Sequence, residues 1–463
     1  KKLFSTPMKT NNRPLWVEII ILAMPLILSM AGIMVMQFVD ALFLSWYSRE
    51  AISAVVPAGM GGYLIVSPFQ AMAGYTSTLV AHYFGAKKEH RAISATWQGI
   101  YCALASGCIV AAVGFFASPI FKLVGHDQSV QGLESIYFAI LCWGAAPVAV
   151  SAAISGFFTG RGKTGVVMIV QLSGIALNAI LAYLLIFGKS FFPEWGMAGA
   201  GIATITAQLF STLLLFAAFL RTKLKDCRSP WLERAFNKEL FWRLLRFGFP
   251  TGMRFGFEML AWTGFILILG RIGIHELAAS NIAFRLNGIA FFPVIGVGQA
   301  VAILVGQAQG RNDIKQTIRV TFTGFILAEI WMLATALIFV IFPGELYSFF
   351  SGDGYAEFEK ITQIGKLLLQ LVAIYCILDA GNIVFSSALQ AAGDTKWIMF
   401  FSVIAHVLFL SGLMLADIYK AGIWVEWLIA TIFVMAMALV WLSRFLSDKW
   451  RSIQVIERHD EVY

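Results

Sequence analysis

The stretch from residue 247 to residue 270 reads FGFPTGMRFGFEMLAWTGFILILG, and it combines an apolar character with a proline and two charged residues. It is apolar and long enough to cross a bilayer as a helix, which requires about 20 residues. It nevertheless contains Pro250, Arg254 and Glu258. A charge at the centre of a bilayer costs about 2.5–3.5 kcal/mol on insertion scales, so such residues usually face a protein interior or a wet cavity and serve a function.

The rest of the chain has the same apolar character. Of its 463 residues, 59% are apolar and 13% are charged, whereas soluble domains carry about 25% charged residues. Apolar segments of helical length recur without strand-type alternation, so we predict an all-α polytopic membrane protein. No segment resembles a cleavable signal peptide, so we expect the first span to stay in the membrane. The twelve predicted spans are residues 15–44, 51–80, 93–116, 132–158, 165–187, 195–220, 240–270, 276–306, 316–342, 365–390, 396–417 and 422–446.

The basic residues predict how these spans are oriented. The two tails and the even-numbered loops, together with the span ends that adjoin them, hold 25 of the 34 Lys and Arg residues, and the odd-numbered loops with their adjoining span ends hold seven. Because basic residues accumulate on the cytoplasmic side of membrane proteins, we expect a plasma (inner) membrane protein with both termini in the cytoplasm. The net charge of +8 is therefore a topology signal, and we expect no nucleic-acid partner.

Repeated landmarks indicate an internal duplication. Three pairs are separated by 225 positions, namely Pro25 and Pro250, Pro68 and Pro293, and Gly85 and Gly310. We predict two pseudo-symmetric six-helix bundles at residues 1–220 and 240–446, a cytoplasmic connecting loop at 221–239 and a cytoplasmic tail at 447–463. Duplicated carriers bind substrate near the bilayer midplane, between interrupted helices. Since proline removes a backbone hydrogen bond, Pro25 and Pro250 are predicted to let the first helix of each half bend.

Four acidic residues lie well inside the predicted spans, namely Asp40, Glu258, Glu329 and Asp379. A buried carboxylate must pair, bind a cation or take up a proton, because ionisation in a low dielectric is costly. This is the chemistry of ion-coupled transport. The alternative is a structural salt bridge, for which Arg254 is the charge partner of Glu258 on the same helical face. Asp40 and Asp379 have no basic residue within a turn or two of their own helix, and we expect Glu329 to be structural.

Motifs for other chemistries are missing from the sequence. GRGKT at 160–164 ends like a phosphate-binding loop, but Phe157 stands where that loop requires its first glycine. The histidines and cysteines show no metal-binding spacing. We therefore expect no enzymatic activity, no cofactor other than a coupling ion, and no metal other than Na⁺. A membrane-embedded transferase would need catalytic residues in a large loop, and the sequence has no such loop. A channel is disfavoured by the duplicated kinked helices.

Five segments carry a family resemblance: FVDALFLS at 38–45, LNAILAYLLIFG at 177–188, GAGIAT at 199–204, GFPTGMRFGFE at 248–258 and YCILDAGNIVFSSALQAAGDTK at 375–396. They resemble the first, fifth, sixth, seventh and tenth helices of the multidrug and toxic compound extrusion (MATE) family, in its NorM-like bacterial branch. The resemblance covers nearly the whole chain. It implies twelve transmembrane helices in two bundles, with a MATE/MOP-type fold.

The resemblance also implies a function and its residues. The expected activity is secondary active efflux of amphipathic, mainly cationic compounds in exchange for H⁺ or Na⁺ by alternating access. The implied cation or proton sites, one in each half, are Asp40, Asn178 and Thr204, and Glu258, Tyr375 and Asp379. Ala182 stands where many members have Asp or Asn. The first-half site therefore lacks one Na⁺ ligand, and we expect Asp40 to carry a proton.

A second function stays open at this point. The alternative is a flippase of the same superfamily that moves a lipid-linked saccharide or a peptidoglycan precursor. Such an anionic head group would need an arginine-rich cavity, but away from the span ends the predicted spans contain only two basic residues, Arg254 and Arg285. This favours small organic cations or drugs as the transported partners. We expect the protein to be a monomer surrounded by membrane lipids.

Overall fold

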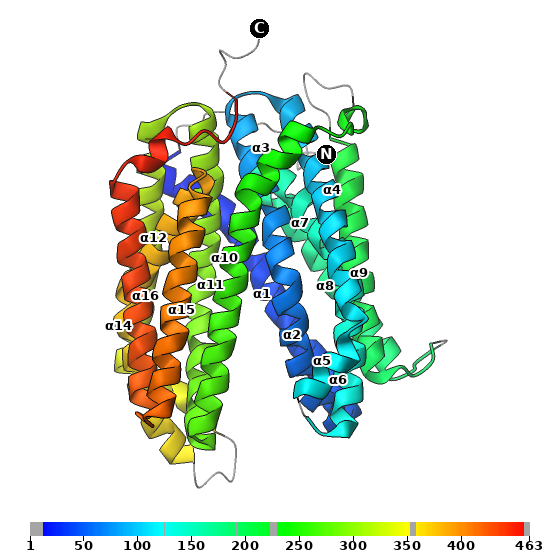
Figure 1. The fold of residues 1–463 in the computed structure, drawn as a ribbon, viewed down its shortest axis with the longest axis vertical. Coiled ribbons are helices and arrows are strands. Elements are labelled where there is room, and N and C mark those ends of the chain that lie inside the picture. Colours follow the sequence, from blue (N-terminus) through cyan, green and yellow to red (C-terminus); the bar gives the residue numbers. More distant parts are fainter. Residues whose placement is uncertain (1–12, 125, 191, 223–228, 352–357, 458–463) are drawn as a thin grey trace. The chain divides into compact units, whose positions relative to one another are not determined.

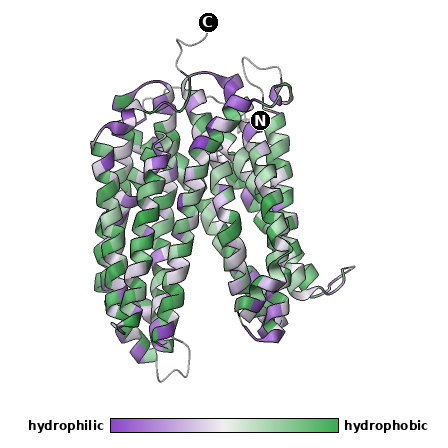
Figure 2. Ribbon diagram, in the orientation of Figure 1, coloured by the Kyte–Doolittle hydropathy of each residue, from purple (hydrophilic) through white to green (hydrophobic). Residues whose placement is uncertain are grey.

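The computed structural model describes residues 13–124, 126–190, 192–222, 229–351 and 358–457. All regular structure within these ranges is helical. Apolar residues run along the helices, and hydrophilic residues gather toward helix ends and connections (Figure 2). Parts of the predicted connecting loop and tail, residues 223–228 and 458–463, lie outside the described residues.

The chain forms sixteen α-helices and two short 3₁₀-helices within the described ranges (Figure 1). The first part of the chain contains α1 (Leu15–Tyr47), α2 (Arg49–Gly74), α3 (Thr76–Gly85), α4 (Glu89–Gly114), α5 (Ala117–Val124), α6 (Gln128–Trp143), α7 (Ala145–Gly160), α8 (Thr164–Ile186), α9 (Gly196–Leu220) and η2 (Pro230–Glu233). The remainder contains α10 (Lys238–Ile272), α11 (Ile274–Gly310), α12 (Ile314–Ile341), α13 (Pro343–Ser348), α14 (Phe358–Ala391), α15 (Thr395–Ile418), α16 (Ile423–Leu446) and η3 (Lys449–Ser452).

These helices confirm the predicted all-α polytopic membrane fold. Within the described residues, eleven helices are long and apolar enough to cross a membrane, with α2 and α3 counted as one span. The bent pair of α6 and α7 supplies the twelfth span, with an angle of 41° between its halves. The predicted span at 132–158 is therefore broken, at Gly144. Pro147 lies in the first turn of α7, where the missing backbone N–H is tolerated.

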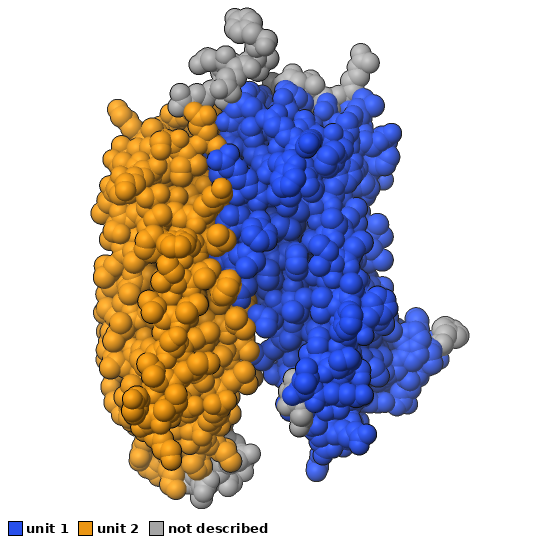
Figure 3. All heavy atoms as spheres, in the orientation of Figure 1, with its two compact units in different colours: residues 1–12, 24–256, 455–463 blue, residues 13–23, 257–454 orange. Residues whose placement is uncertain are grey.

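The residues cluster into two compact units (Figure 3). Unit 1 contains Met24–Gly256 and the chain from Val455 onward, and unit 2 contains Arg13–Ala23 and Phe257–Gln454. The divisions fall inside α1 and α10, so each of these helices contributes to both units. Pro25 and Pro250 lie within these two continuous helices, and bending at either proline stays a prediction.

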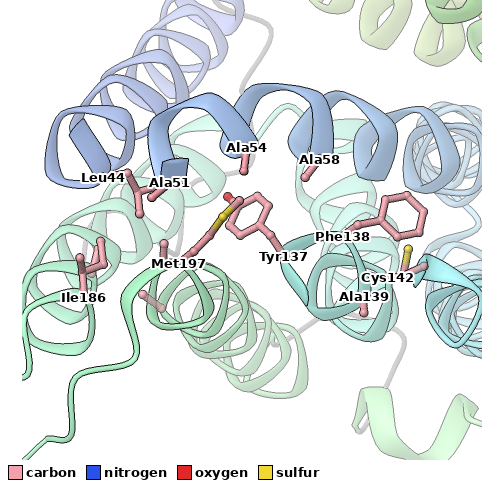
Figure 4. Close-up of a cluster of buried hydrophobic side chains, with 14 of the residues drawn as sticks. Leu44, Ala51, Ala54, Ala58, Tyr137, Phe138, Ala139, Cys142, Ile186 and Met197 are labelled. Carbon is pink, nitrogen blue, oxygen red and sulfur yellow. The ribbon is translucent and has the colours of Figure 1, made fainter. Parts of the chain in front are cut away.

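In unit 1, α7 packs against α3, α4 and α9, and α2 packs against α6. The crossing of α7 and α3 depends on Gly156 and Gly160, because a Cβ atom at either position would lie within 2.7 Å of the Ser77 backbone. Small residues one turn apart allow this close approach of membrane helices. Figure 4 shows part of the buried cluster, in which Ala54 of α2 faces Tyr137 of α6.

In unit 2, α14 packs against α11, α12 and α16, so it lies at the centre of this group of helices. Aromatic rings fill the space between α11 and α16, and the ring centroids of Phe284 and Trp427 are 5.0 Å apart. The Trp427 indole also donates a 3.1 Å hydrogen bond to the Ser280 hydroxyl. A buried tryptophan needs such a partner for its N–H group, so this contact fixes the two helices against each other.

Candidate functional site

Asp40 lies on α1, deep inside unit 1. Its side chain is 6% exposed, and its Oδ1 atom has no hydrogen-bond partner among the described residues. Asn178 of α8 lies close to this carboxyl and is itself fully buried. The Asn178 amide donates a 3.2 Å hydrogen bond to the Thr204 hydroxyl of α9, which in turn donates to the Ala200 carbonyl. The structure therefore brings together the three residues predicted for the first half.

Two further residues define the surroundings of Asp40. Ala182 lies one turn after Asn178 and is fully buried in the apolar cluster of unit 1. It therefore presents a methyl group at the position where an Asp or Asn side chain would offer an oxygen ligand for Na⁺. Tyr137 of α6 lies close to both the Asp40 carboxyl and the Thr204 hydroxyl. Sequence reasoning did not include Tyr137. A tyrosine inside an apolar span could have indicated this contact, because a buried tyrosine hydroxyl needs a polar neighbour.

Asp379 lies on α14, at the centre of unit 2, and is 3% exposed. The Asn382 amide donates a 3.0 Å hydrogen bond to Asp379 Oδ1. The Asn382 carbonyl oxygen in turn accepts a 2.9 Å hydrogen bond from the Trp441 indole of α16. Neither Asn382 nor Trp441 was predicted, although Asn382 follows Asp379 by one helical turn and could have been found from that spacing.

The other predicted residues of this half lie near Asp379. Tyr375 is one turn earlier on α14 and is 4% exposed, and Glu258 of α10 interacts electrostatically with the Asp379 carboxyl. Arg254 precedes Glu258 by one turn of α10, and a pairing of these two residues stays a prediction. The structure adds Glu329 of α12, which also interacts electrostatically with Asp379 and has one carboxyl oxygen without a hydrogen-bond partner among the described residues.

The placement of Glu329 differs from the sequence expectation of a merely structural residue. It lies near Asp379 because α12 packs directly against α14. Phe325, one turn before Glu329, packs against Phe385 of α14 in a tilted arrangement with the ring centroids 5.2 Å apart, so this side of α12 faces α14. The position of a residue on its helix does not reveal which neighbouring helix it faces, so sequence alone could not make this assignment.

The two groups offer different chemistry. In unit 1, the Asp40 carboxyl has neutral amide, hydroxyl and phenol neighbours, which suits a group that gains and loses a proton. Unit 2 presents Asp379 with two more carboxylates in electrostatic range, and negative charge and oxygen ligands attract hard cations. The described residues contain no set of three or more His, Cys, Asp or Glu side chains arranged to hold a metal ion. The acidic residues of unit 2 thus form a negative environment and not a closed cage.

Apolar helices of membrane-spanning length with buried carboxylates define a multi-pass membrane protein of the transporter class. The MatE family model matches residues 25–184 and 250–412, which is more than half of the chain. The chain belongs to this family, the MATE transporters, and many of its curated relatives are named NorM. The two matches begin at Pro25 and Pro250, at the same offset as the landmarks of the duplication.

Individual relatives cover nearly the whole chain. The probable multidrug resistance protein NorM of Geobacillus kaustophilus is 27% identical over 454 residues, which are 96% of each chain. The probable multidrug resistance protein NorM of Thermotoga maritima is 24% identical over 450 residues, 95% of this chain and 94% of the relative. A solved structure of a multidrug resistance MATE family transporter of the MOP superfamily, in an outward-facing conformation, matches with a TM-score of 0.83 and 18% identity. That match covers 96% of this chain and 100% of the other, and it shows the shared fold.

Proposed function

We propose that this protein is a secondary active multidrug efflux antiporter of the plasma (inner) membrane. It exports amphipathic, mainly cationic compounds in exchange for H⁺ or Na⁺ by alternating access, with both termini in the cytoplasm. The observation that carries the proposal is that each unit buries an aspartate inside a membrane-spanning helix, Asp40 of α1 in unit 1 and Asp379 of α14 in unit 2. Neither forms an ion pair within the described part of the chain. The family and the names of the relatives support multidrug efflux as the transport activity.

The exchange follows from the two states of a carboxyl group. An ionised Asp379 attracts a cation and accepts a charge-assisted hydrogen bond from Asn382. Binding of H⁺ or Na⁺ removes this attraction, so the organic cation and the coupling ion compete for the same charge. A change of a few kcal/mol at one group shifts a two-state conformational equilibrium by orders of magnitude. This links ion binding to the release of the exported compound.

We assign the proton to Asp40 and the stronger cation environment to unit 2. Among the described residues, no second carboxylate influences Asp40, and Ala182 supplies no oxygen where a Na⁺ ligand would be required. Asn178 and Thr204 can hydrogen-bond a protonated carboxyl. Asp40 lies on the same helix as Pro25, and the missing backbone hydrogen bond at Pro25 makes a change of bend in α1 inexpensive.

The proposal is tested with the purified full chain in proteoliposomes that contain a fluorescent lipophilic cation. A pH gradient and a Na⁺ gradient are imposed separately, and efflux is measured for each. We expect the pH gradient to drive efflux without Na⁺ and Asp40→Asn to abolish this response. The matched control is Glu134→Gln, because Glu134 is fully buried in the same unit but is bonded to His126 at 2.7 Å. This control should keep pH-driven efflux.

Two results would contradict the proposal. A strict requirement for Na⁺, with no effect of the pH gradient, would reject the assignment of a proton to Asp40. Movement of an anionic lipid-linked saccharide without an ion gradient, with no efflux of the organic cation under either gradient, would reject antiport and favour the flippase.

A further inference from the structure

A basic cavity lies at the beginning of α1 in unit 2, and its lining residues include neither Asp40 nor Asp379. The cavity has a volume of about 430 Å³. Its walls come from the residues that open α1 and from the first turns of α12, two segments that are about 300 positions apart in the sequence. The lining residues are Arg13, Pro14, Leu15, Glu18, Gln316 and Arg319.

Within the described part of the chain, other side chains do not engage the charged groups of this cavity. Within the described residues, no ion pair or hydrogen bond involves the side chains of Arg13, Glu18 or Arg319. Other arginines of the chain are bound, for example Arg444, whose guanidinium lies 2.6 Å from the Asp394 carboxylate. Two guanidinium groups with free donors on one cavity match the oxygen atoms of a phosphate, which arginine binds through paired hydrogen bonds.

The surroundings of the cavity identify the source of the phosphate. Trp16 begins the apolar surface of α1 and is 51% exposed, and Ile20 and Ile21 continue that surface away from the cavity. Tryptophan at such a boundary marks the level of lipid head groups. A free phosphate would leave this apolar surface unused, whereas the acyl chains of a phospholipid would cover it. The positive-inside rule assigns this end of the helices to the cytoplasm, where anionic lipids bind basic pockets between helices.

We propose that this cavity binds the head-group phosphate of a singly charged anionic phospholipid from the cytoplasmic leaflet. Arg13 and Arg319 hold the phosphate oxygens, and Gln316 adds an amide donor. Glu18 reduces the net charge of the lining from two positive charges to one, so one phosphodiester neutralises the cavity. The bound lipid ties the first turns of α1 to α12 within unit 2. This inference does not depend on the proposed transport function.

The experiment uses the purified full chain in neutral detergent micelles. Short-chain phosphatidylglycerol, phosphatidylcholine or inorganic phosphate is added, and an apparent affinity is taken from the rise of the thermal unfolding midpoint. We expect phosphatidylglycerol to stabilise the protein and the other two probes to have little effect. Arg319→Gln should weaken the apparent affinity for phosphatidylglycerol roughly tenfold or more, since it removes a charge-assisted contact. The matched control Lys315→Gln removes the same charge one turn earlier on α12, outside the lining, and should change the affinity less than twofold or threefold.

The Glu18→Gln variant keeps both guanidinium groups and removes the negative charge. It should bind phosphatidylglycerol more tightly than the unchanged chain, and this result remains measurable if Arg319→Gln does not fold. Equal stabilisation by phosphatidylglycerol and phosphatidylcholine would overturn the proposal. Equal losses in Arg319→Gln and Lys315→Gln would show a diffuse charge effect and also overturn it. Equal stabilisation by inorganic phosphate would reject the lipid and leave a site for free phosphate.

Discussion

Asp379 is oriented by a line of hydrogen bonds that begins on another helix. The Trp441 indole of α16 donates to Asn382, and the Asn382 amide donates to the Asp379 carboxyl. A fully buried tryptophan is a rigid donor, so α16 fixes the rotamer of Asn382 and, through it, the direction of the Asp379 oxygens. The carboxyl is thus held in place without a basic partner among the described residues. This leaves its charge available for a proton or a cation.

At the residue scale, we predict that Asp379→Asn folds normally and loses gradient-driven efflux. The asparagine oxygen can still accept the hydrogen bond from Asn382, so the free energy of unfolding should change by about 1 kcal/mol or less. The side chain can no longer change its charge, so coupling should be lost. Both quantities are measured on one preparation, by thermal unfolding and by efflux from proteoliposomes.

The matched control for this prediction is Glu426→Gln. Glu426 is another fully buried carboxyl of unit 2, and neither of its oxygens has a hydrogen-bond partner within the described residues. It is separate from the group around Asp379, so this variant should retain efflux. Full transport by a folded Asp379→Asn variant would contradict the role of Asp379 in coupling. An equal loss of efflux in both variants would show that efflux is sensitive to any buried carboxyl in this unit.

The glycines of α10 explain much of the stretch from residue 247 to residue 270. Gly248 and Gly252 are one turn apart on α10 and pack against the backbone of α2. A Cβ atom at Gly252 would be 2.3 Å from the Pro68 carbonyl oxygen, and one at Gly248 would be 2.9 Å from the Met72 carbonyl oxygen. Both contacts are with backbone atoms, which cannot move aside as the end of a flexible side chain can. The first half of α10 therefore packs closely against α2, within unit 1, through a face of α10 that carries no side chains at Gly248 and Gly252.

At the element scale, we predict that Gly252→Ala destabilises the protein. Alanine favours a helix over glycine by up to about 1 kcal/mol, but overpacking typically costs about 1–3 kcal/mol. Because the clash is with a backbone carbonyl, we expect a net loss of about 1–2 kcal/mol in the free energy of unfolding in mixed micelles. The control is Gly165→Ala in α8, where a Cβ atom would meet nothing within 4 Å, and it should be neutral or stabilising. A Gly252→Ala variant as stable as Gly165→Ala would show that α10 does not lie this close to α2.

The end of the chain is fixed by residues far away in the sequence. After α16, Trp450 is fully buried and stacks on Phe445, with the ring centroids 5.1 Å apart. Glu457 then lies in unit 1, where its carboxylate is 2.9 Å from the Arg243 guanidinium and accepts 3.3 Å hydrogen bonds from the Tyr83 hydroxyl. Burial alone would raise the pKa of Glu457, but the neighbouring Arg243 and Arg91 charges hold the pKa below its ordinary value.

At the scale of the whole molecule, we predict that this docking of the tail depends on pH. The folded-state pKa of Glu457 is lowered, so its contribution is fully present above the unfolded-state pKa of about 4.3. The contribution is lost as the pH falls through the lower, folded-state value. Hydrogen exchange at residues 453–457, corrected for intrinsic rates, should therefore be slow at neutral pH and accelerate in acid.

The Glu457→Gln variant should exchange roughly tenfold faster than the unchanged chain at neutral pH, because a charged hydrogen bond contributes about 1.5–3 kcal/mol. Its exchange should then vary little with pH. The control is Glu239→Gln, which removes the other carboxylate on Arg243; Glu239 is 56% exposed and should matter less. Protection that is independent of pH in the unchanged chain would rule out this role for Glu457.

Part of the candidate site was open to prediction because its signals are local. A carboxyl inside an apolar span is unusual wherever it occurs, so Asp40, Glu258 and Asp379 were visible from the sequence, and the resemblance added Asn178, Thr204 and Tyr375. The structure brings Asn178 and Thr204 beside Asp40, and Tyr375 and Glu258 beside Asp379. Asn382 could have been found from its spacing to Asp379, whereas the contacts of Tyr137 with Asp40 and of Trp441 with Asn382 join different helices and could not be read from the sequence.

The sequence by itself determined which segments are apolar and long enough to span a membrane, and it contains landmarks that repeat 225 positions apart. Transfer from water to lipid is a sum over residues of one segment, so hydropathy and length suffice for the spans. Only the tertiary structure showed that the fourth span is broken at Gly144 and that Glu329 lies near Asp379. It also showed that the glycines of α10 pack against α2 and that Glu457 pairs with Arg243. These contacts depend on how each helix is rotated and which helix lies next to it. Packing of side chains from distant parts of the chain sets that rotation, and no single segment contains the information.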